Sequence, residues 1–197
     1  HADWFLAQKD FAADVQAGKL APVTIVEASD VQGVLSPDEG PPGDVDIGQD
    51  FVASTIGAVM SSPFWKSSAV FLSYDENGGM YDHVVPPKAC PPDGLPPNNG
   101  GSVGFDQLGF RVPMIVVSPY VIPGQVAHTQ YEFGSILKYV EQTFGLGSLG
   151  TTDARAHSIG NVLHLSQNPL PFDPIPSDKP RSYFLHRPPS YEPVDSE

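Results

Sequence analysis

The sequence predicts an α/β protein with a mostly parallel sheet that carries helices on its faces. Two features of the 197-residue chain predict this class: short runs of apolar and β-branched residues, and longer segments between them whose apolar residues recur at helical spacing. Strands that alternate with helices in this way form parallel sheets, whose faces the helices cover. The chain is long enough to bury one sizeable core.

The amino-terminal part predicts a helix, a strand and a second helix. Apolar residues at helical spacing in "DWFLAQKDFAADVQAGKL" predict a helix that stops at Gly18. The β-branched run Val23–Glu27 predicts a strand. After a Gly/Pro/Asp-rich loop, Asp46 and Gln49 have the spacing of a capping box and open a helix over Ile47–Met60.

The second half predicts two more strands and one more helix. Thr129 and Glu132 again have the spacing of a capping box, and Gly145 supplies the residue after the helix end. Beyond residue 165 the chain becomes rich in proline, which predicts an extended tail over residues 166–197. The remaining predicted elements are a strand at Ala69–Tyr74, a long loop at Asp75–Leu108, a strand at Met114–Ser118 and a helix at Gln130–Phe144.

Charge and composition exclude two classes of protein. The net charge is -13 with a pI near 4.6 and no basic stripe, so we do not expect nucleic acid binding. No run of about 18 apolar residues is present, so we do not expect a transmembrane protein. No signal peptide is visible and the chain opens without methionine, as a processed or truncated chain would. Cys90 is the single cysteine, either free or paired with a segment outside this chain.

The candidate chemistry lies where an apolar strand runs into acids and glycines, in "FLSYDENGGMYDHVVPP". Ligands of open α/β sheets bind outside the carboxyl ends of the strands, and Asp75 and Glu76 follow such an end. Two adjacent carboxylates attract a hard divalent cation, and Gly78 and Gly79 permit the turn that would bring both to one ion. The alternative is a solvated turn with ordinary acids.

His83 is the second candidate, because it follows Asp82 directly. An Asp–His pair can orient an imidazole for catalysis or metal binding. The two adjacent side chains can equally diverge and leave His83 to stabilise the loop, and spacing alone favours this second interpretation. Ser135 lies inside a predicted helix and lacks the G-x-S-x-G elbow, so we do not expect it to be a nucleophile.

At "YDENGGMYDHVVPP" the sequence resembles the phosphoesterase family of bacterial phospholipases C and acid phosphatases, whose fold is related to that of alkaline phosphatase. Further stretches agree in the same order and together cover nearly the whole chain. They are "FAADVQAGKLAPVTIVEAS", "GPPGDVDIGQDFVASTIGAVMSSPFW", "GFRVPMIVVSPYVIPGQVAHTQYEFGSILKYVEQTFGLGSL" and "TTDARAHSIGNVLHL".

The resemblance implies an α/β/α sandwich, with residues 1–165 as the carboxyl-terminal part of a phosphoesterase domain. It implies metal-dependent hydrolysis of phosphate esters, with Asp75 and Glu76 as metal ligands and Asp75, Glu76 and His83 as catalytic residues. It further implies a divalent metal ion of unknown identity as cofactor and a periplasmic or secreted location.

Two departures from the family pattern shape this expectation. Gly40 stands where relatives look to have a histidine, which puts one phosphate-facing contact of the family pattern in doubt. The amino-terminal half, which in relatives carries the hydroxyl nucleophile and a Glu-Asn metal site, is absent from this sequence. We therefore expect a companion segment or companion chain to supply it. The alternative function is a non-catalytic surface or binding module that retains the fold. The sequence does not distinguish monoester, diester and phospholipid substrates.

Overall fold

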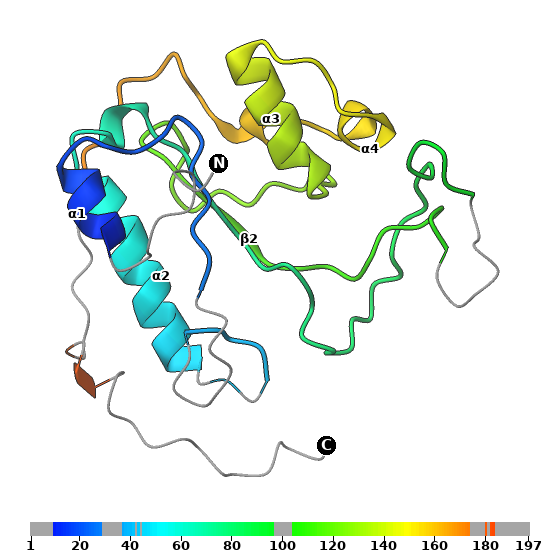
Figure 1. Ribbon diagram of the computed structural model, residues 1–197, viewed down its shortest axis with the longest axis horizontal. Helices are drawn as coiled ribbons and strands as arrows, with labels where there is room; N and C mark the ends of the chain where they lie inside the picture. Colours follow the sequence, from blue (N-terminus) through cyan, green and yellow to red (C-terminus); the bar gives the residue numbers. More distant parts are fainter. Residues whose placement is uncertain are drawn as a thin grey trace. The chain divides into compact units, whose positions relative to one another are not determined.

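The structure of the chain is a computed structural model that describes residues 10–28, 37–41, 43, 45–96, 104–173, 180 and 182–183. The chain divides into two compact units, which are described in turn. The first comprises His1–Ser68 and Pro171–Glu197, and the second comprises Ala69–Leu170. Figure 1 shows the elements of both units in the colours of the sequence.

The described part of the first unit is helical. Helix α1 (Phe11–Gln16) packs against α2 (Val45–Met60), and the short 3-10 helix η3 (Trp65–Ser67) follows. Val15 of α1 is fully buried, so the apolar spacing that predicted this helix also positions its core residue. The predicted stop is confirmed, because Gly18 has a φ of 72°, a conformation that glycine adopts without steric cost. The second predicted helix is also confirmed.

The strand predicted at Val23–Glu27 is wrong. Residues 21–28 contain no β-strand, and Val23 and Ile25 are largely exposed. A β-branched run becomes a strand only when a neighbouring strand supplies hydrogen-bond partners and a covered face. No such neighbour pairs with these described residues.

The second unit contains the sheet, and its direction corrects the prediction of a parallel arrangement. Strand β1 (Val70–Ser73) pairs antiparallel with β2 (Met114–Val117), with Val70 opposite Val117 and Ser73 opposite Met114. A parallel pair needs a crossover connection, commonly a helix, to return the chain to the same edge. The described residues between β1 and β2 form no helix that would make such a crossover. Among the described residues, this two-stranded sheet is the only one.

Two helices and a 3-10 helix complete the second unit: α3 (Gly134–Phe144), α4 (Thr151–Arg155) and η4 (Ile159–Val162). α3 packs against both α4 and η4 (Figure 1). The ring of Phe71 in β1 meets Tyr139 in α3 edge to face, with ring centroids 5.4 Å apart. These contacts join α3 to the sheet and to the two short helices.

The beginning of α3 differs from the prediction, whereas its end agrees. The helix starts at Gly134 rather than Gln130, because the Glu132 carboxylate pairs with Arg155 instead of capping the helix. Gly134 lies so close to α4 that a Cβ atom there would sit 2.9 Å from the carbonyl oxygen of Thr152. The predicted end is confirmed, since Gly145 adopts the left-handed conformation with φ 65°.

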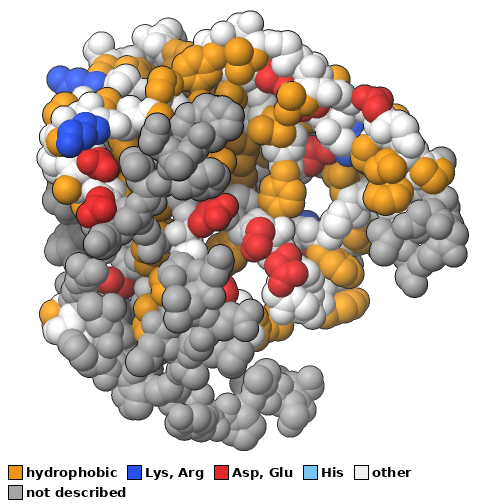
Figure 2. All heavy atoms as spheres, viewed as in Figure 1, with side chains coloured by type: hydrophobic (Ala, Val, Ile, Leu, Met, Phe, Trp, Pro, Cys, Tyr) orange, Lys and Arg blue, Asp and Glu red, His pale blue; other side chains and the backbone are white. Residues whose placement is uncertain are grey.

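Large apolar side chains remain exposed on both strand and helix surfaces of the second unit, including Ile115 of β2 and Leu137 and Phe144 of α3. Acidic side chains are spread over the face drawn in Figure 2, where apolar side chains are also exposed. None of the helices in the described segments is long and apolar enough to span a bilayer. Most of the predicted tail, at residues 174–179, 181 and 184–197, lies outside the described residues.

Candidate functional site

The long segment between β1 and β2 folds back on itself as an extended ribbon with two arms. Beyond the strands, the backbone N–H of Leu108 donates to the carbonyl of Pro87 at 3.0 Å, and that of Ala89 donates to Asp106 at 2.9 Å. Lys88 and Gln107 form an isolated antiparallel bridge between the same arms. The loop predicted between the strands therefore continues their antiparallel pairing, and the candidate residues lie on its outgoing arm.

Asp75 and Glu76 lie directly beyond β1, separated from Ser73 by Tyr74 alone. Both are exposed, and Asp75 Oδ1 accepts the backbone N–H of Glu76 at 3.0 Å. β1 thus delivers two adjacent carboxylates to the surface at its carboxyl end. That both carboxylates face one pocket stays a prediction.

The glycines after this pair make the predicted turn. Gly78 and Gly79 have φ values of 64° and 75°, in the left-handed region that favours glycine. Asn77 closes the turn from both sides: its carbonyl accepts the N–H of Met80 at 3.1 Å, and its side-chain amide donates to the Met80 carbonyl at 2.7 Å. The chain therefore reverses just after the two acids.

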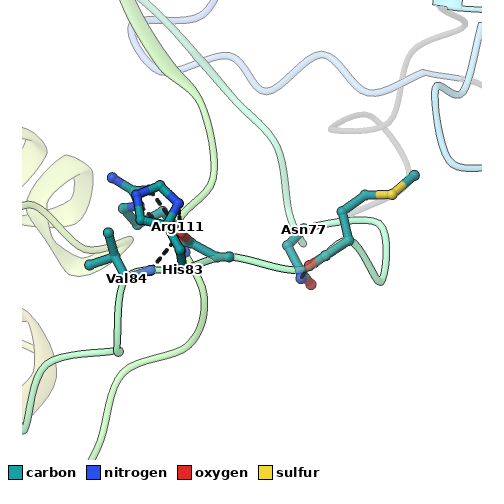
Figure 3. Close-up of polar contacts among 6 residues, drawn as sticks. Asn77, His83, Val84 and Arg111 are labelled. Atoms are coloured by element: carbon teal, nitrogen blue, oxygen red, sulfur yellow. Dashed lines mark hydrogen bonds and ion pairs between the residues drawn. The ribbon is translucent and has the colours of Figure 1, made fainter. Parts of the chain in front are cut away.

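Asp82 binds Arg111 rather than orienting His83. Arg111 donates from Nε to Oδ2 at 2.8 Å and from Nη2 to Oδ1 at 2.7 Å, so the guanidinium grips both carboxylate oxygens. His83 Nδ1 lies 4.0 Å from Oδ1, and the imidazole side chain is 81% exposed. Figure 3 shows Arg111, His83 and Val84 together, with Asn77 farther along the segment. The hydrogen bonds from Arg111 and from the Val84 N–H hold the pKa of the Asp82 carboxyl well below its usual range.

The described residues do not complete a metal site by themselves. Nowhere in the described ranges do three or more His, Cys, Asp or Glu side chains gather in a way that could hold an ion. Asp75 and Glu76 have the oxygen chemistry that a hard cation prefers. Ser135 is fully buried, and its Oγ accepts the backbone N–H of Glu132 at 3.0 Å.

Two contacts with α4 hold the middle of the ribbon, and sequence reasoning missed both. The Asp93 carboxylate accepts hydrogen bonds from the backbone N–H and the hydroxyl of Thr151, at the first residue of α4. At the other end of α4, Arg155 binds the carbonyl of Cys90 and pairs with Glu132 at 2.7 Å. The Cys90 thiol itself is free and exposed. These partners are distant in sequence, so no local pattern indicates them.

A second group of carboxylates is buried between α3 and α4. Asp153 is only 1% exposed, and it accepts the Ser148 hydroxyl at 2.7 Å and the N–H groups of Leu149 at 2.7 Å and Gly150 at 2.9 Å. The Ser148 hydroxyl, more than the other donors, holds the pKa of Asp153 well below its usual range. Its neighbour Glu141 is buried, and this burial, together with the Asp153 charge, raises the pKa of Glu141. The Oε1 atom of Glu141 has no hydrogen-bond partner within the described part of the chain.

Comparison with known proteins identifies the family of the chain. The profile of the Phosphoesterase family matches residues 2–147, a range that contains the whole ribbon. Over 173 residues the chain is 36% identical to non-specific phospholipase C1 of Arabidopsis thaliana, which covers 81% of this chain and 32% of that protein. It is 35% identical over 166 residues to phospholipase C B of Mycobacterium tuberculosis, covering 78% of this chain and 30% of the relative. The chain thus spans about a third of the length of these relatives.

Proposed function

The chain belongs to the phosphoesterase family, and on this premise we propose that it supplies the carboxylate part of a metal-dependent hydrolase of phosphate esters. The observation that carries the proposal is the exposed Asp75–Glu76 pair at the end of β1, within the matched range. The relatives named as phospholipases C favour a phosphodiester, and in particular a phospholipid, as substrate. Phosphomonoesters are the second substrate class to test.

We propose that the active form is an assembled enzyme, in which this chain is joined by residues that match the rest of the relatives' length. These residues can lie in the same polypeptide or on a companion chain. They would supply the hydroxyl nucleophile and the remaining metal ligands. The coverage supports this division, since this chain matches about a third of each relative.

Asp75 and Glu76 would hold a divalent cation, which when bound stabilises negative charge on the phosphoryl oxygens. Without a cation, two carboxylates at this position would repel a phosphate ester, so their acidity itself favours a metal site. The His83 side chain is 81% exposed, and its imidazole would give a proton to the leaving oxygen of a bound substrate. Asp82 would not take part directly, because Arg111 occupies both of its oxygens.

The test is hydrolysis by the assembled enzyme, purified without added metal. Phosphatidylcholine vesicles, bis(p-nitrophenyl) phosphate and p-nitrophenyl phosphate represent the phospholipid, diester and monoester classes. We expect turnover of phosphatidylcholine and of the diester, its loss after treatment with EDTA, and its recovery on addition of a divalent cation.

A protein that hydrolyses none of the three substrates, with or without divalent cations, would contradict the proposal. That outcome would favour the alternative, a non-catalytic module that retains the family's sequence. Gly40 is the feature that favours this alternative, since it lacks a side chain where a histidine is expected from the family pattern. Turnover that persists in EDTA would contradict the metal dependence but not the esterase activity.

A further inference from the structure

The two arms of the ribbon have unequal lengths, and this inequality locates the candidate site. The strands place Ser73 opposite Met114, and the next backbone contact between the arms joins Pro87 to Leu108. The outgoing arm is thus much longer between these points than the returning arm. Its surplus forms an excursion, residues 74–82, which contains Asp75 and Glu76.

Two local hydrogen bonds help to shape the inside of this excursion. Asp75 binds the N–H of Glu76, and Asn77 closes a turn with Met80. The paired strand β1 fixes the entrance. A segment of this kind keeps one orientation only if its exit is fixed as well, because a loop with one free end retains its conformational entropy.

Arg111 fixes the carboxyl-terminal end of the excursion at Asp82. Its guanidinium makes the two side-chain hydrogen bonds to Asp82, and its backbone N–H lies 3.4 Å from Oδ2. The same carboxylate accepts the N–H of Val84 at 3.0 Å, which folds the chain around His83. The Asp82 side chain is only 12% exposed, although that of Arg111 is 60% exposed. A planar guanidinium that binds a carboxylate through two parallel bonds fixes orientation as well as distance.

We propose that Arg111 is a positioning residue for the candidate site, because its ion pair with Asp82 closes the 74–82 excursion and so orients Asp75, Glu76 and His83. The inference rests on the proposed phosphoesterase function. Arg111 acts through Asp82 and is itself not assigned contact with the substrate. The role also explains why Asp82 is not available to His83, whose Nδ1 is 4.0 Å away.

Three variants of the assembled enzyme distinguish a role in orienting the site residues from a role in stabilising the ribbon. Arg111→Met removes the ion pair, and Arg111→Lys keeps the charge but loses the two parallel bonds. Lys88→Met is the matched control, since Lys88 forms a single exposed ion pair with Asp106 across the same ribbon, at 3.3 Å. Amide hydrogen exchange of residues 74–84 is measured beside kcat and KM for bis(p-nitrophenyl) phosphate, well below the unfolding temperature.

We expect Arg111→Met to accelerate exchange in residues 74–84 and to lower kcat about a hundredfold, the size of effect that a displacement of about 1 Å produces. KM should change far less, and Arg111→Lys should restore melting temperature better than kcat. Lys88→Met should leave exchange in this segment and kcat unchanged. A residue that only stabilised the ribbon would change kcat and melting temperature together, so a loss of kcat with restored melting temperature indicates positioning.

Several outcomes would overturn the inference. If kcat is unchanged in Arg111→Met, the ion pair only stabilises the fold. If kcat falls without faster exchange in residues 74–84, Arg111 acts on the substrate directly. If the wild-type enzyme is inactive, the proposed function is wrong, and the positioning role is wrong with it. This outcome is distinguished from the others because it is measured before any variant is made.

Discussion

Two pairs of carboxylates in the second unit have the same chemistry and opposite surroundings. Asp75 and Glu76 are exposed at the end of β1, and the hydrogen bond shown for the Asp75 carboxylate comes from the N–H of the next residue. Asp153 and Glu141 are buried between α3 and α4, where Asp153 accepts three strong hydrogen bonds. The buried Asp153 binds groups of the fold through these hydrogen bonds, whereas the exposed pair has oxygens available for a ligand.

This comparison shows that an acid's partners indicate its role better than its position in a motif. Asp82 belongs to the Asp–His motif and was a candidate to orient the imidazole, yet both of its oxygens bind Arg111. Its role resembles that of Asp153, because both carboxylates are saturated with donors. Asp75 differs from both, and it is the acid that substitution should separate most clearly from the fold.

The largest effect is expected from Asp75→Asn in the assembled enzyme. The substitution keeps the shape of the side chain and removes the charge that attracts a cation, so hydrolysis of bis(p-nitrophenyl) phosphate should fall by orders of magnitude. The melting temperature should hardly change, because the side chain is exposed. Asp106→Asn, an acid on the returning arm, is the control and should retain activity. Unaltered turnover in Asp75→Asn would leave a solvated turn as the better account of this pair.

Asp153→Ala is expected to lower stability and to leave activity unchanged, the opposite of Asp75→Asn. It leaves the Ser148 hydroxyl and the N–H groups of Leu149 and Gly150 without their acceptor in a buried place, and such groups are costly to leave unpaired. We expect a fall of several degrees in the melting temperature, measured by circular dichroism, and full activity per folded molecule at lower temperature. A variant that melts like the wild type would contradict the structural role of this carboxylate.

A smaller effect is expected from pH, through Glu141. The pKa of Glu141 is raised in the folded protein, so its contribution to stability is complete below its ordinary value of 4.5 and is lost as the pH rises through the folded-state pKa. The charged groups facing it are Asp153 from α4, which raises this pKa, and Lys138 of α3, which lowers it. Asp153 contributes with the opposite sign, since its lowered pKa makes it stabilising above its ordinary value and less so in acid.

Glu141→Gln tests the direction in which the stability contribution of Glu141 changes with pH. The difference in unfolding free energy between variant and wild type should move in favour of the variant as the pH rises above about 4.5, because glutamine cannot ionise. Asp173→Asn, at an exposed position, is the control and should show no such trend. A constant difference between Glu141→Gln and wild type across pH 4 to 8 would mean that Glu141 does not titrate abnormally.

Local patterns predicted the helices of this chain better than its sheet. The apolar spacing in Ile47–Met60 identified α2, and Gly18 and Gly145 identified two helix ends, because these signals depend on neighbouring residues alone. The parallel sheet was wrong because strand direction depends on how the long connection between β1 and β2 folds. The strand at Val23–Glu27 was wrong because a β-branched run needs a partner that its own sequence does not specify.

The acids and glycines of the candidate site could be predicted from the sequence, whereas the ion pair that supports them could not. Asp75 and Glu76 follow an apolar strand, and the two glycines supply the turn, so one short segment contains all of that information. Arg111 is far along the chain from Asp82, and only the folded ribbon brings the two together. The periplasmic or secreted location and the divalent cation stay predictions.

The central claim is that the exposed pair at the end of β1 binds a divalent cation, and metal content tests it most directly. The assembled enzyme, its Asp75→Asn/Glu76→Gln variant and the Asp106→Asn control would be purified under native conditions and measured by inductively coupled plasma mass spectrometry. We predict stoichiometric divalent metal in the wild type and the control, and its loss from the double variant with folding retained. Equal metal content in all three proteins, or no metal in any of them, would contradict the claim.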